Sequence, residues 1–200
     1  MFRALLLAPP GAGKGTQGER LAARHGVPHL ATGDLLREHV AKRTDLGQAA
    51  EEHMLAGRLV PDHLVIDMVL RKIEGEGDEP ALRAFLLDGF PRTLTQARAA
   101  YEWGRQNERT FDAVILLEVP DDELVRRLVQ RGREQGRADD TEEVIRERLT
   151  VYERNTAPLI DFYDRRGILV RVDGTGTVDE VTERIEQGLA ELGDRSRSPR

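Results

Sequence analysis

Short apolar runs alternate with amphipathic stretches along almost the whole chain. Nearly continuous apolar runs of strand length occupy residues 2–8, 27–30, 84–88, 112–119 and 167–172. Helical periodicity lies between and after them, at 14–25, 62–74, 121–131 and 178–192, and in a segment that opens at Asp140 and that Pro158 interrupts. Continuous apolarity is typical of strands buried on both faces of a parallel sheet. The pattern therefore predicts an α/β, doubly wound fold with a parallel five-stranded sheet and helices on both faces.

Three segments do not fit this alternation. Residues 31–60 predict two short helices without a strand between them, and residues 131–140, "RGREQGRADD", predict a polar loop. Both are expected to be insertions over one edge of the sheet. Residues 193–200 carry no apolar side chain, so we expect this tail to be disordered.

Composition and charge narrow the class of protein. A chain of 200 residues with 39% hydrophobic content can bury one packed core. The net charge of -6 argues against a dedicated nucleic-acid binder, and the absence of cysteine excludes disulfides and thiolate metal sites. The apolar run at the start is too short for a signal peptide or a membrane span. We therefore expect a soluble, cytoplasmic and monomeric protein with neither a nucleic-acid nor a membrane partner.

The stretch "LLLAPPGAGKGTQ", residues 5–17, has the features of a phosphate-binding loop. Gly11, Gly13 and Gly15 connect a predicted strand to a predicted helix. Backbone N–H groups in such a turn converge on phosphate oxygens, and the helix N-terminus adds positive potential. Lys14 adds a full positive charge for the outer phosphates. A plain glycine turn of an α/β protein would not require that lysine.

The loop departs from the common pattern G-x-x-x-x-G-K-[ST] in two places. Ala8 stands where the first glycine belongs, and the hydroxyl comes one residue late, at Thr16. "PGAGKGTQ" resembles the phosphate loop of the adenylate kinase family, G-x-P-G-x-G-K-G-T, in which the late threonine is usual. Because Pro9 disfavours the α region for the residue before it, we expect Ala8 to be extended, with negative φ and a packed methyl group.

Five further segments are similar to the same family and follow in the same order. They are "ATGDLLR" (31–37), "GRLVPD" (57–62), "LDGFPRTLTQA" (87–97), "RGREQGRADD" (131–140) and "VDGTG" (172–176). The resemblance implies one P-loop kinase domain over residues 1–200. In it, residues 31–60 would form a small helical AMP-binding insertion. Residues 131–140 would form a short lid without the metal-binding knuckle of the larger lids.

The resemblance also assigns residues to ATP, to AMP and to catalysis. The expected ATP-binding residues are Gly11, Ala12, Gly13, Lys14, Gly15, Thr16, Arg127, Arg131 and Gly176. The expected AMP-binding residues are Thr32, Arg37, Arg58, Val60, Gly89, Arg92, Gln96, Arg137 and Arg148. The expected catalytic residues are Lys14, Asp88, Arg92, Arg127, Arg137 and Arg148.

The chemistry of individual side chains agrees with several of these roles. Guanidinium groups bind phosphate bidentately, which suits Arg37 and Arg92 for the AMP phosphate. Asp88 ends a predicted strand, where parallel sheets bind ligands, and it suits the water shell of Mg²⁺. A turn cap for "GFP" remains an alternative for Asp88. The amide of Gln96 offers a donor and an acceptor to the edge of adenine.

The arginines near the predicted lid allow two interpretations. Glu123 can offset Arg127 four residues later, so a solvated, salt-bridged helix face remains possible for that arginine. Arg131, Arg133 and Arg137 crowd a glycine-containing loop, where bound phosphates would relieve their repulsion. The resemblance gives Arg133 no role.

These parts predict reversible, Mg²⁺-dependent phosphoryl transfer from ATP to AMP, giving two ADP. Mg²⁺ would be held by phosphates and water, near Thr16 and Asp88 and without direct protein ligands, and no structural zinc is expected. A UMP/CMP or other nucleoside monophosphate kinase is the main alternative, although Thr32 and Thr93 favour AMP. A GTPase-type switch lacks its N-K-x-D and D-x-x-G motifs here. A catalytically silent nucleotide-binding module would not need so many arginines.

Overall fold

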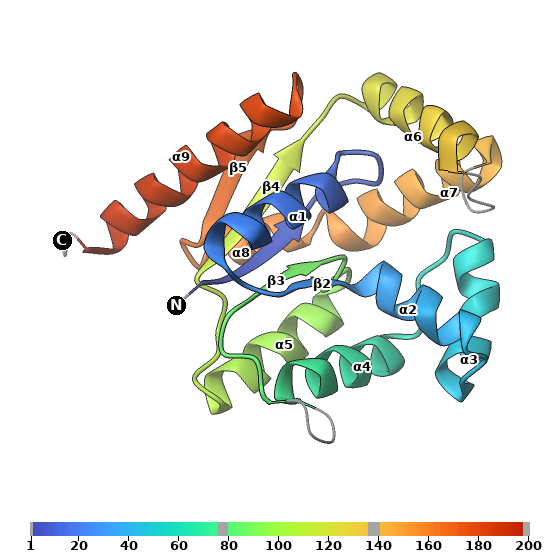
Figure 1. The fold of residues 1–200 in the computed structure, drawn as a ribbon, viewed down its shortest axis with the longest axis horizontal. Coiled ribbons are helices and arrows are strands. Elements are labelled where there is room, and N and C mark those ends of the chain that lie inside the picture. The colour runs from blue at the N-terminus through green and yellow to red at the C-terminus, as the bar shows by residue number, and fades with distance from the viewer. Residues whose placement is uncertain (1, 76–79, 136–140, 198–200) are drawn as a thin grey trace.

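A five-stranded parallel sheet forms the centre of the molecule (Figure 1). The structure is a computed structural model, and it describes residues 2–75, 80–135 and 141–197. The strands are β1 (Arg3–Leu7), β2 (His29–Ala31), β3 (Phe85–Asp88), β4 (Ala113–Glu118) and β5 (Leu169–Asp173). Their order is β2-β3-β1-β4-β5, with parallel pairing throughout. The predicted α/β doubly wound architecture is thus confirmed.

Alternate residues of the central strand enter two separate hydrophobic cores. β1 pairs with β3 on one side, Leu5 opposite Leu87, and with β4 on the other, Leu5 opposite Val114. Leu5 packs in one core and Leu6 in the other, because successive side chains of a strand point to opposite faces. Burial on both faces explains why the strands read as continuous apolar runs.

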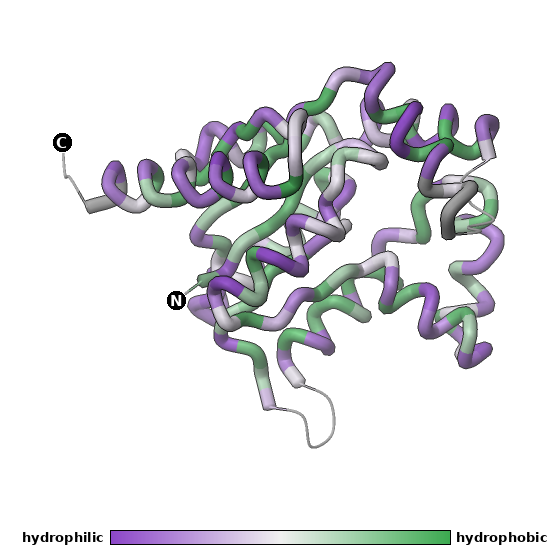
Figure 2. The backbone as a smooth tube through the Cα atoms, turned by 45° about the horizontal axis from the view of Figure 1, so that its top comes forward, coloured by the Kyte–Doolittle hydropathy of each residue, from purple (hydrophilic) through white to green (hydrophobic). Residues whose placement is uncertain are grey.

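Helices cover both faces of the sheet. One core is completed by α1 (Lys14–His25), α6 (Asp121–Gln135) and α9 (Val178–Arg197). The other is completed by α4 (Asp62–Glu74), α5 (Leu94–Gln106) and α8 (Leu159–Asp164). Figure 2 shows hydrophobic positions along the strands and hydrophilic positions recurring along the outer helices.

Two short helices project from the sheet after β2, as the sequence predicts. They are α2 (Thr32–Ala41) and α3 (Asp45–Leu55), and no strand separates them. A Cβ atom on Gly47 would lie 2.1 Å from the carbonyl oxygen of His39. Only glycine therefore allows α3 to approach α2 this closely.

The chain after α6 forms an interrupted helix. Thr141, rather than Asp140, caps α7 (Glu142–Val151), since its hydroxyl accepts from the N–H of Val144. A π-helix, η1 (Tyr152–Thr156), follows, and α8 begins after Pro158. The predicted interruption at Pro158 is confirmed. A proline cannot donate an N–H, and its ring clashes with the preceding turn.

Two predicted boundaries are wrong. α6 continues to Gln135, so residues 131–135 are helical rather than part of a loop, and residues 136–140 lie outside the described residues. α9 continues to Arg197, so the expected disorder does not hold for residues 193–197. The sequence analysis also missed α5, whose N-cap Thr93 accepts from the N–H of Gln96.

Candidate active site

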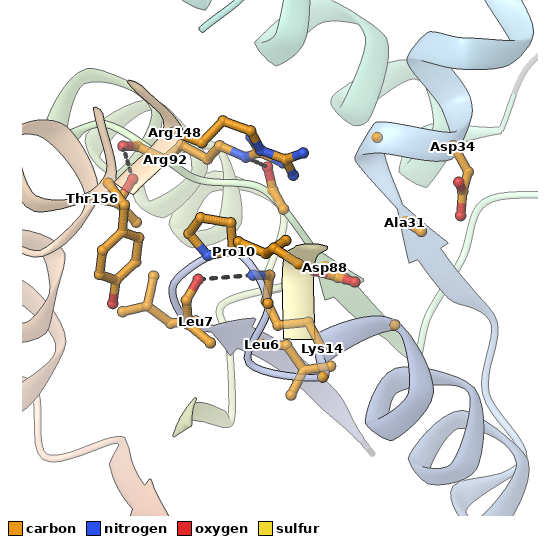
Figure 3. A pocket seen from close by; sticks show the side chains of 18 of the residues that line it. Leu6, Leu7, Pro10, Lys14, Ala31, Asp34, Asp88, Arg92, Arg148 and Thr156 are labelled. Atoms are coloured by element: carbon orange, nitrogen blue, oxygen red, sulfur yellow. Dashed lines mark hydrogen bonds between the residues drawn. The ribbon is translucent and has the colours of Figure 1, made fainter. Parts of the chain in front are cut away.

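A cavity of about 470 Å³ opens at the carboxyl edge of the sheet. It lies between the ends of β1 and β3, the helices α2, α6 and α7, and the loop that carries Gly11, Gly13 and Gly15 (Figure 3). This loop is called the glycine loop below. Open α/β sheets bind ligands at this edge because the loops that follow the strands meet there. The volume lies in the range typical of small-molecule sites.

The start of α1 faces this cavity with its backbone N–H groups uncapped. Gly13 is the N-cap residue, at φ 89°, and no side chain caps the helix or adds negative charge to its first turn. Four N–H groups at a helix N-terminus lack intrahelical partners, so an uncapped end can receive an anion. The glycine loop therefore has the geometry of a phosphate site.

Glycine stands at three positions of the loop, 11, 13 and 15, and the physical reason for it differs between them. Gly11 and Gly13 have positive φ, and a Cβ on Gly11 would lie 2.9 Å from the carbonyl oxygen of Leu124. Gly15 does not have positive φ, and apart from its chain neighbours and the backbone of its own helix no described atom lies within 4 Å of where its Cβ would be. The close approach of a ligand to the backbone is a remaining reason for glycine at position 15.

Lys14 folds back over the loop. Its Nζ donates to the carbonyl oxygens of Ala8, at 2.8 Å, and Pro9, at 3.1 Å. Ala8 is 4% exposed and is not among the residues with positive φ. The predicted negative φ and the predicted burial of Ala8 are confirmed.

Arg92 lines the cavity, and its side chain is held by the backbone of its own loop. Its Nε donates to the carbonyl oxygen of Gly89 at 2.9 Å, and the positive φ of Gly89 lets the backbone approach this side chain closely. Burial lowers the pKa of Arg92 from its ordinary value, Asp88 opposes this shift, and the charge of Arg37 adds to it. The guanidinium remains charged, as arginine does throughout proteins.

Arginines from three parts of the chain line the cavity together with Arg92. Arg37 of α2 pairs with Asp34 at 2.5 Å, and Arg148 of α7 lies on the same side as Arg92 (Figure 3). Arg127 of α6 pairs with Glu123 at 2.7 Å and also donates to the carbonyl oxygen of Gly174 at 3.2 Å. Arg127 is therefore a salt-bridged helix residue that also lines the cavity, and its binding to phosphate stays a prediction.

Asp88 and Thr16 stand near the glycine loop, as expected. Asp88 is the last residue of β3 and lines the cavity, and its Oδ2 lies 3.8 Å from Nε2 of His29. Thr16 also lines the cavity. Across the described residues, no three histidine, aspartate or glutamate side chains gather in a way that could hold a metal ion.

A smaller cavity of about 80 Å³ adjoins the first on the side of α2 and α3. Its lining includes Thr32, Arg58, Val60 and Gly89, and it shares Arg37, Arg92 and Arg148 with the larger cavity. The Oγ1 atom of Thr32 is buried and has no hydrogen-bond partner among the residues that the structure describes. Because buried polar atoms are normally paired, this hydroxyl is suited to a ligand atom.

Some residues predicted for the site do not line either cavity. Gln96 is 2% exposed and lies next to Arg92, behind the residues that line the cavities. Gly176, at φ 95°, lies in the loop between β5 and α9. Arg131 lies on α6, but its side chain is outside the described part of the chain, and Arg137 is outside it entirely.

Sequence reasoning missed three residues around the site. Tyr152 and Thr156 of η1 line the cavity, and Asp62 binds Gln96 from the start of α4. Burial, with a smaller effect of Glu118, raises the pKa of Tyr152 to about 12, so its hydroxyl stays protonated at neutral pH. Tyr152 and Thr156 lie in no quoted motif, and Asp62 ends the segment "GRLVPD" but has its partners at distant positions in the sequence.

Comparison with known proteins agrees with this geometry. The family described as "Adenylate kinase" matches residues 6–168. Adenylate kinases from Clavibacter michiganensis subsp. michiganensis, Synechococcus sp. and Thermus thermophilus are 48%, 50% and 45% identical to the chain. The alignments cover 99%, 94% and 92% of this chain and 98%, 98% and 95% of those proteins. No described helix has the length and apolarity needed to cross a membrane. The extent of the family match and the identity over nearly the whole length show that the chain belongs to the adenylate kinase family of phosphotransferases.

Proposed function

We propose that the two cavities together bind ATP and AMP and transfer the γ-phosphoryl group between them, giving two ADP reversibly. The observation that carries this proposal is the position of an uncapped helix N-terminus and four arginines around one space. Phosphoryl transfer requires alignment and charge neutralisation more than acid or base chemistry. The site offers positive charge and no obvious general base.

The ATP phosphates are placed at the glycine loop. The N–H groups of residues 11–16 and the Nζ of Lys14 would bind the β- and γ-phosphates, with Lys14 leaving the carbonyl oxygens of Ala8 and Pro9. Arg127 would neutralise the phosphoryl group that moves, and Gly176 would also bind ATP. The position of Arg127 in the cavity and its bond to the carbonyl oxygen of Gly174, in the loop that contains Gly176, support placing both residues at ATP.

AMP is placed in the smaller cavity. Arg37 and Arg92 would bind its phosphate, and Thr32 and Val60 would border the base. Arg148 lines both cavities, so it is suited to neutralise the group that moves between them. Arg131 and Arg137 are proposed to join from the lid.

The residues present fit a magnesium ion held by phosphates and water. Mg²⁺ keeps several waters and takes few carboxylates, and Asp88 is a partly buried strand-end carboxylate beside the loop. When bound with ATP, Mg²⁺ would neutralise phosphate charge. Asp88 and Thr16 would orient its water shell.

Exclusion of water is proposed to come from residues 31–60 and 131–140. A Cβ on Gly57, at the end of the insertion, would lie 3.0 Å from Val144 and 3.1 Å from Arg148 of α7. The insertion thus already contacts the helix that carries a catalytic arginine. A closed site would suppress transfer of the phosphoryl group to water.

A coupled assay with ATP and a panel of nucleoside monophosphates tests the proposal. We expect AMP to be used far better than UMP or CMP, and the names of the relatives do not favour a pyrimidine acceptor. Turnover that is absent with AMP, or higher with UMP, would refute it. The protein is further proposed to act as a cytoplasmic monomer without nucleic-acid partners, which light scattering of purified protein would test for the oligomeric state.

A further inference from the structure

A carboxylate outside both cavities holds the side chain of Gln96. Oδ1 of Asp62 accepts from Nε2 of Gln96 at 2.7 Å, and Oδ2 of Asp62 accepts from the hydroxyl of Thr93 at 2.9 Å. On its other side, Oε1 of Gln96 accepts from the backbone N–H of Arg92 at 2.7 Å. Gln96 is almost fully buried, so these partners and not water determine its position.

The two partners fix which way the amide of Gln96 faces. A backbone N–H can only donate, so it requires the amide oxygen. An ionised carboxylate can only accept, so it requires the amide nitrogen. A flipped amide would set two donors against each other at Arg92 and two acceptors against each other at Asp62. The orientation therefore follows from the chemistry of the partners and not from a choice between similar atoms.

Helix capping accounts for only part of this arrangement. Thr93 is the N-cap of α5 and Gln96 is its N3 residue, so the pair resembles a capping box. Such a box needs the Thr93 hydroxyl and the Gln96 oxygen. It does not need a carboxylate from another helix, 34 residues away in sequence, on the amide nitrogen.

Among the hydrogen bonds of the described residues, each amide atom of Gln96 uses only one of its two hydrogen-bonding positions. Nε2 has a second hydrogen, and Oε1 has a second lone pair. The remaining pattern, a donor beside an acceptor, matches the N1 acceptor and the N6 donor of a 6-aminopurine. A 6-oxopurine has the reverse pattern, because its N1–H donates and its O6 accepts. Only a flipped amide would pair with it.

We propose that Asp62 is a specificity-determining residue that locks Gln96 in the orientation for 6-aminopurine monophosphates and against 6-oxopurine monophosphates. The inference rests on the proposed function, in which AMP binds on this side, and on the expectation from the sequence that Gln96 reads its base. Asp62 is a positioning residue, since it acts through Gln96 and lines neither cavity.

The test compares AMP with IMP, which differ in this edge of the base, for the wild type and for Asp62→Asn. An asparagine can accept from Thr93 through its oxygen and then turns its NH₂ group toward Gln96. That group favours the flipped amide. We expect kcat/KM for AMP relative to IMP to fall about tenfold, the size of one hydrogen bond to a charged group. The KM for ATP should stay the same.

Asp67→Asn is the matched control. Asp67 lies on the same helix and is exposed, paired with Arg71 four residues later. The same chemical change there should leave the AMP to IMP ratio unchanged. Asp62→Ala serves as a second variant if Asp62→Asn does not fold. The expected fall in kcat/KM for AMP relative to IMP is smaller for alanine, because alanine has no group that stabilises the flipped amide of Gln96.

The outcomes separate the inference from the function on which it rests. If the wild type does not use AMP, the proposed function fails. If the wild type uses AMP but Asp62→Asn and Asp62→Ala lower AMP and IMP use by the same factor, Asp62 only supports the fold and the inference is overturned. A fall in the ratio that Asp67→Asn does not share supports it.

Discussion

Two small residues of the glycine loop owe their size to opposite surroundings. The methyl group of Ala8 is packed in the core beside Leu6 and Ala12, whereas the space around Gly15 is open in the described structure. Packing explains the alanine, and room for a ligand explains the glycine. A comparison with the common loop pattern alone would treat Ala8 as a defect.

We expect Ala8→Gly to change ATP affinity little. The residue does not have positive φ, so the glycine relieves no strain, but it adds conformational freedom to the unfolded chain. The free energy of unfolding, measured by urea denaturation, should fall by roughly 0.5–1 kcal/mol. A large gain in ATP affinity would instead show that the alanine hinders the loop.

Lys14→Met should leave the fold intact and lower kcat by orders of magnitude. The lysine donates to the carbonyl oxygens of Ala8 and Pro9 in its own loop, so its loss chiefly removes positive charge from the site. Circular dichroism and the coupled assay measure the two effects. An unchanged kcat would contradict the assigned role.

At the residue scale, the sequence predicts what lies within a motif and misses what depends on distant partners. Lys14, Arg37, Arg92 and Asp88 line one cavity as the motifs suggest. Asp62 ends the segment "GRLVPD", but its role could not be found in this way, because it depends on Thr93 and Gln96, which only the packing of α4 beside α5 brings near.

At the scale of elements, η1 links the helix of Arg148 to the loop of Arg92. The hydroxyl of Thr156, at the end of η1, donates to the backbone carbonyl oxygen of Arg92 at 2.9 Å. The amide of Gln96 holds the N–H of the same residue. Arg92 is therefore fixed from two sides, and η1 is one of them.

Thr156→Val should raise the KM for AMP by roughly five- to tenfold, as expected for about 1 kcal/mol from one hydrogen bond. Valine has the shape of threonine without the donor, so the KM for ATP should change little. Initial-rate kinetics with each substrate varied separates the two constants. Thr156→Ser, which keeps the hydroxyl, is the control. Equal effects of valine and serine would indicate a packing role only.

Element boundaries were predicted less well than the elements themselves, for identifiable reasons. Residues 131–135 are polar but include arginine, glutamate and glutamine, which favour helices. Polarity alone therefore does not end α6. In α9, the buried Leu192 anchors the helix just before its polar end, and propagation is easier than nucleation. α5 was missed although "TLTQ" has the spacing of a capping box.

At the scale of the whole molecule, the alternation of apolar runs and helices was sufficient to predict the parallel sheet. It did not predict the strand order, because several orders are compatible with right-handed crossovers. The convergence of Arg37, Arg92 and Arg148 could be expected only from the family resemblance. Periodicity places each on an element but not beside the others.

Metal content is a property of the whole molecule that can be measured directly. We expect purified protein to contain no stoichiometric zinc, since the chain has no cysteine and its predicted lid is short. Elemental analysis after mild chelation tests this. Zinc at one equivalent per chain would show a site that the sequence does not reveal.

The shared direction of the strands separates the ends of the chain from the cavity. β1 begins at the amino edge of the sheet, and α9 starts near the carboxyl edge and returns toward the amino edge (Figure 1). The cavity lies at the opposite, carboxyl edge. An affinity tag, a fused reporter or a linker to a solid support at either end would extend away from the entrance for nucleotides. The molecule can therefore be immobilised on a sensor surface through either end while its cavity stays accessible from solution.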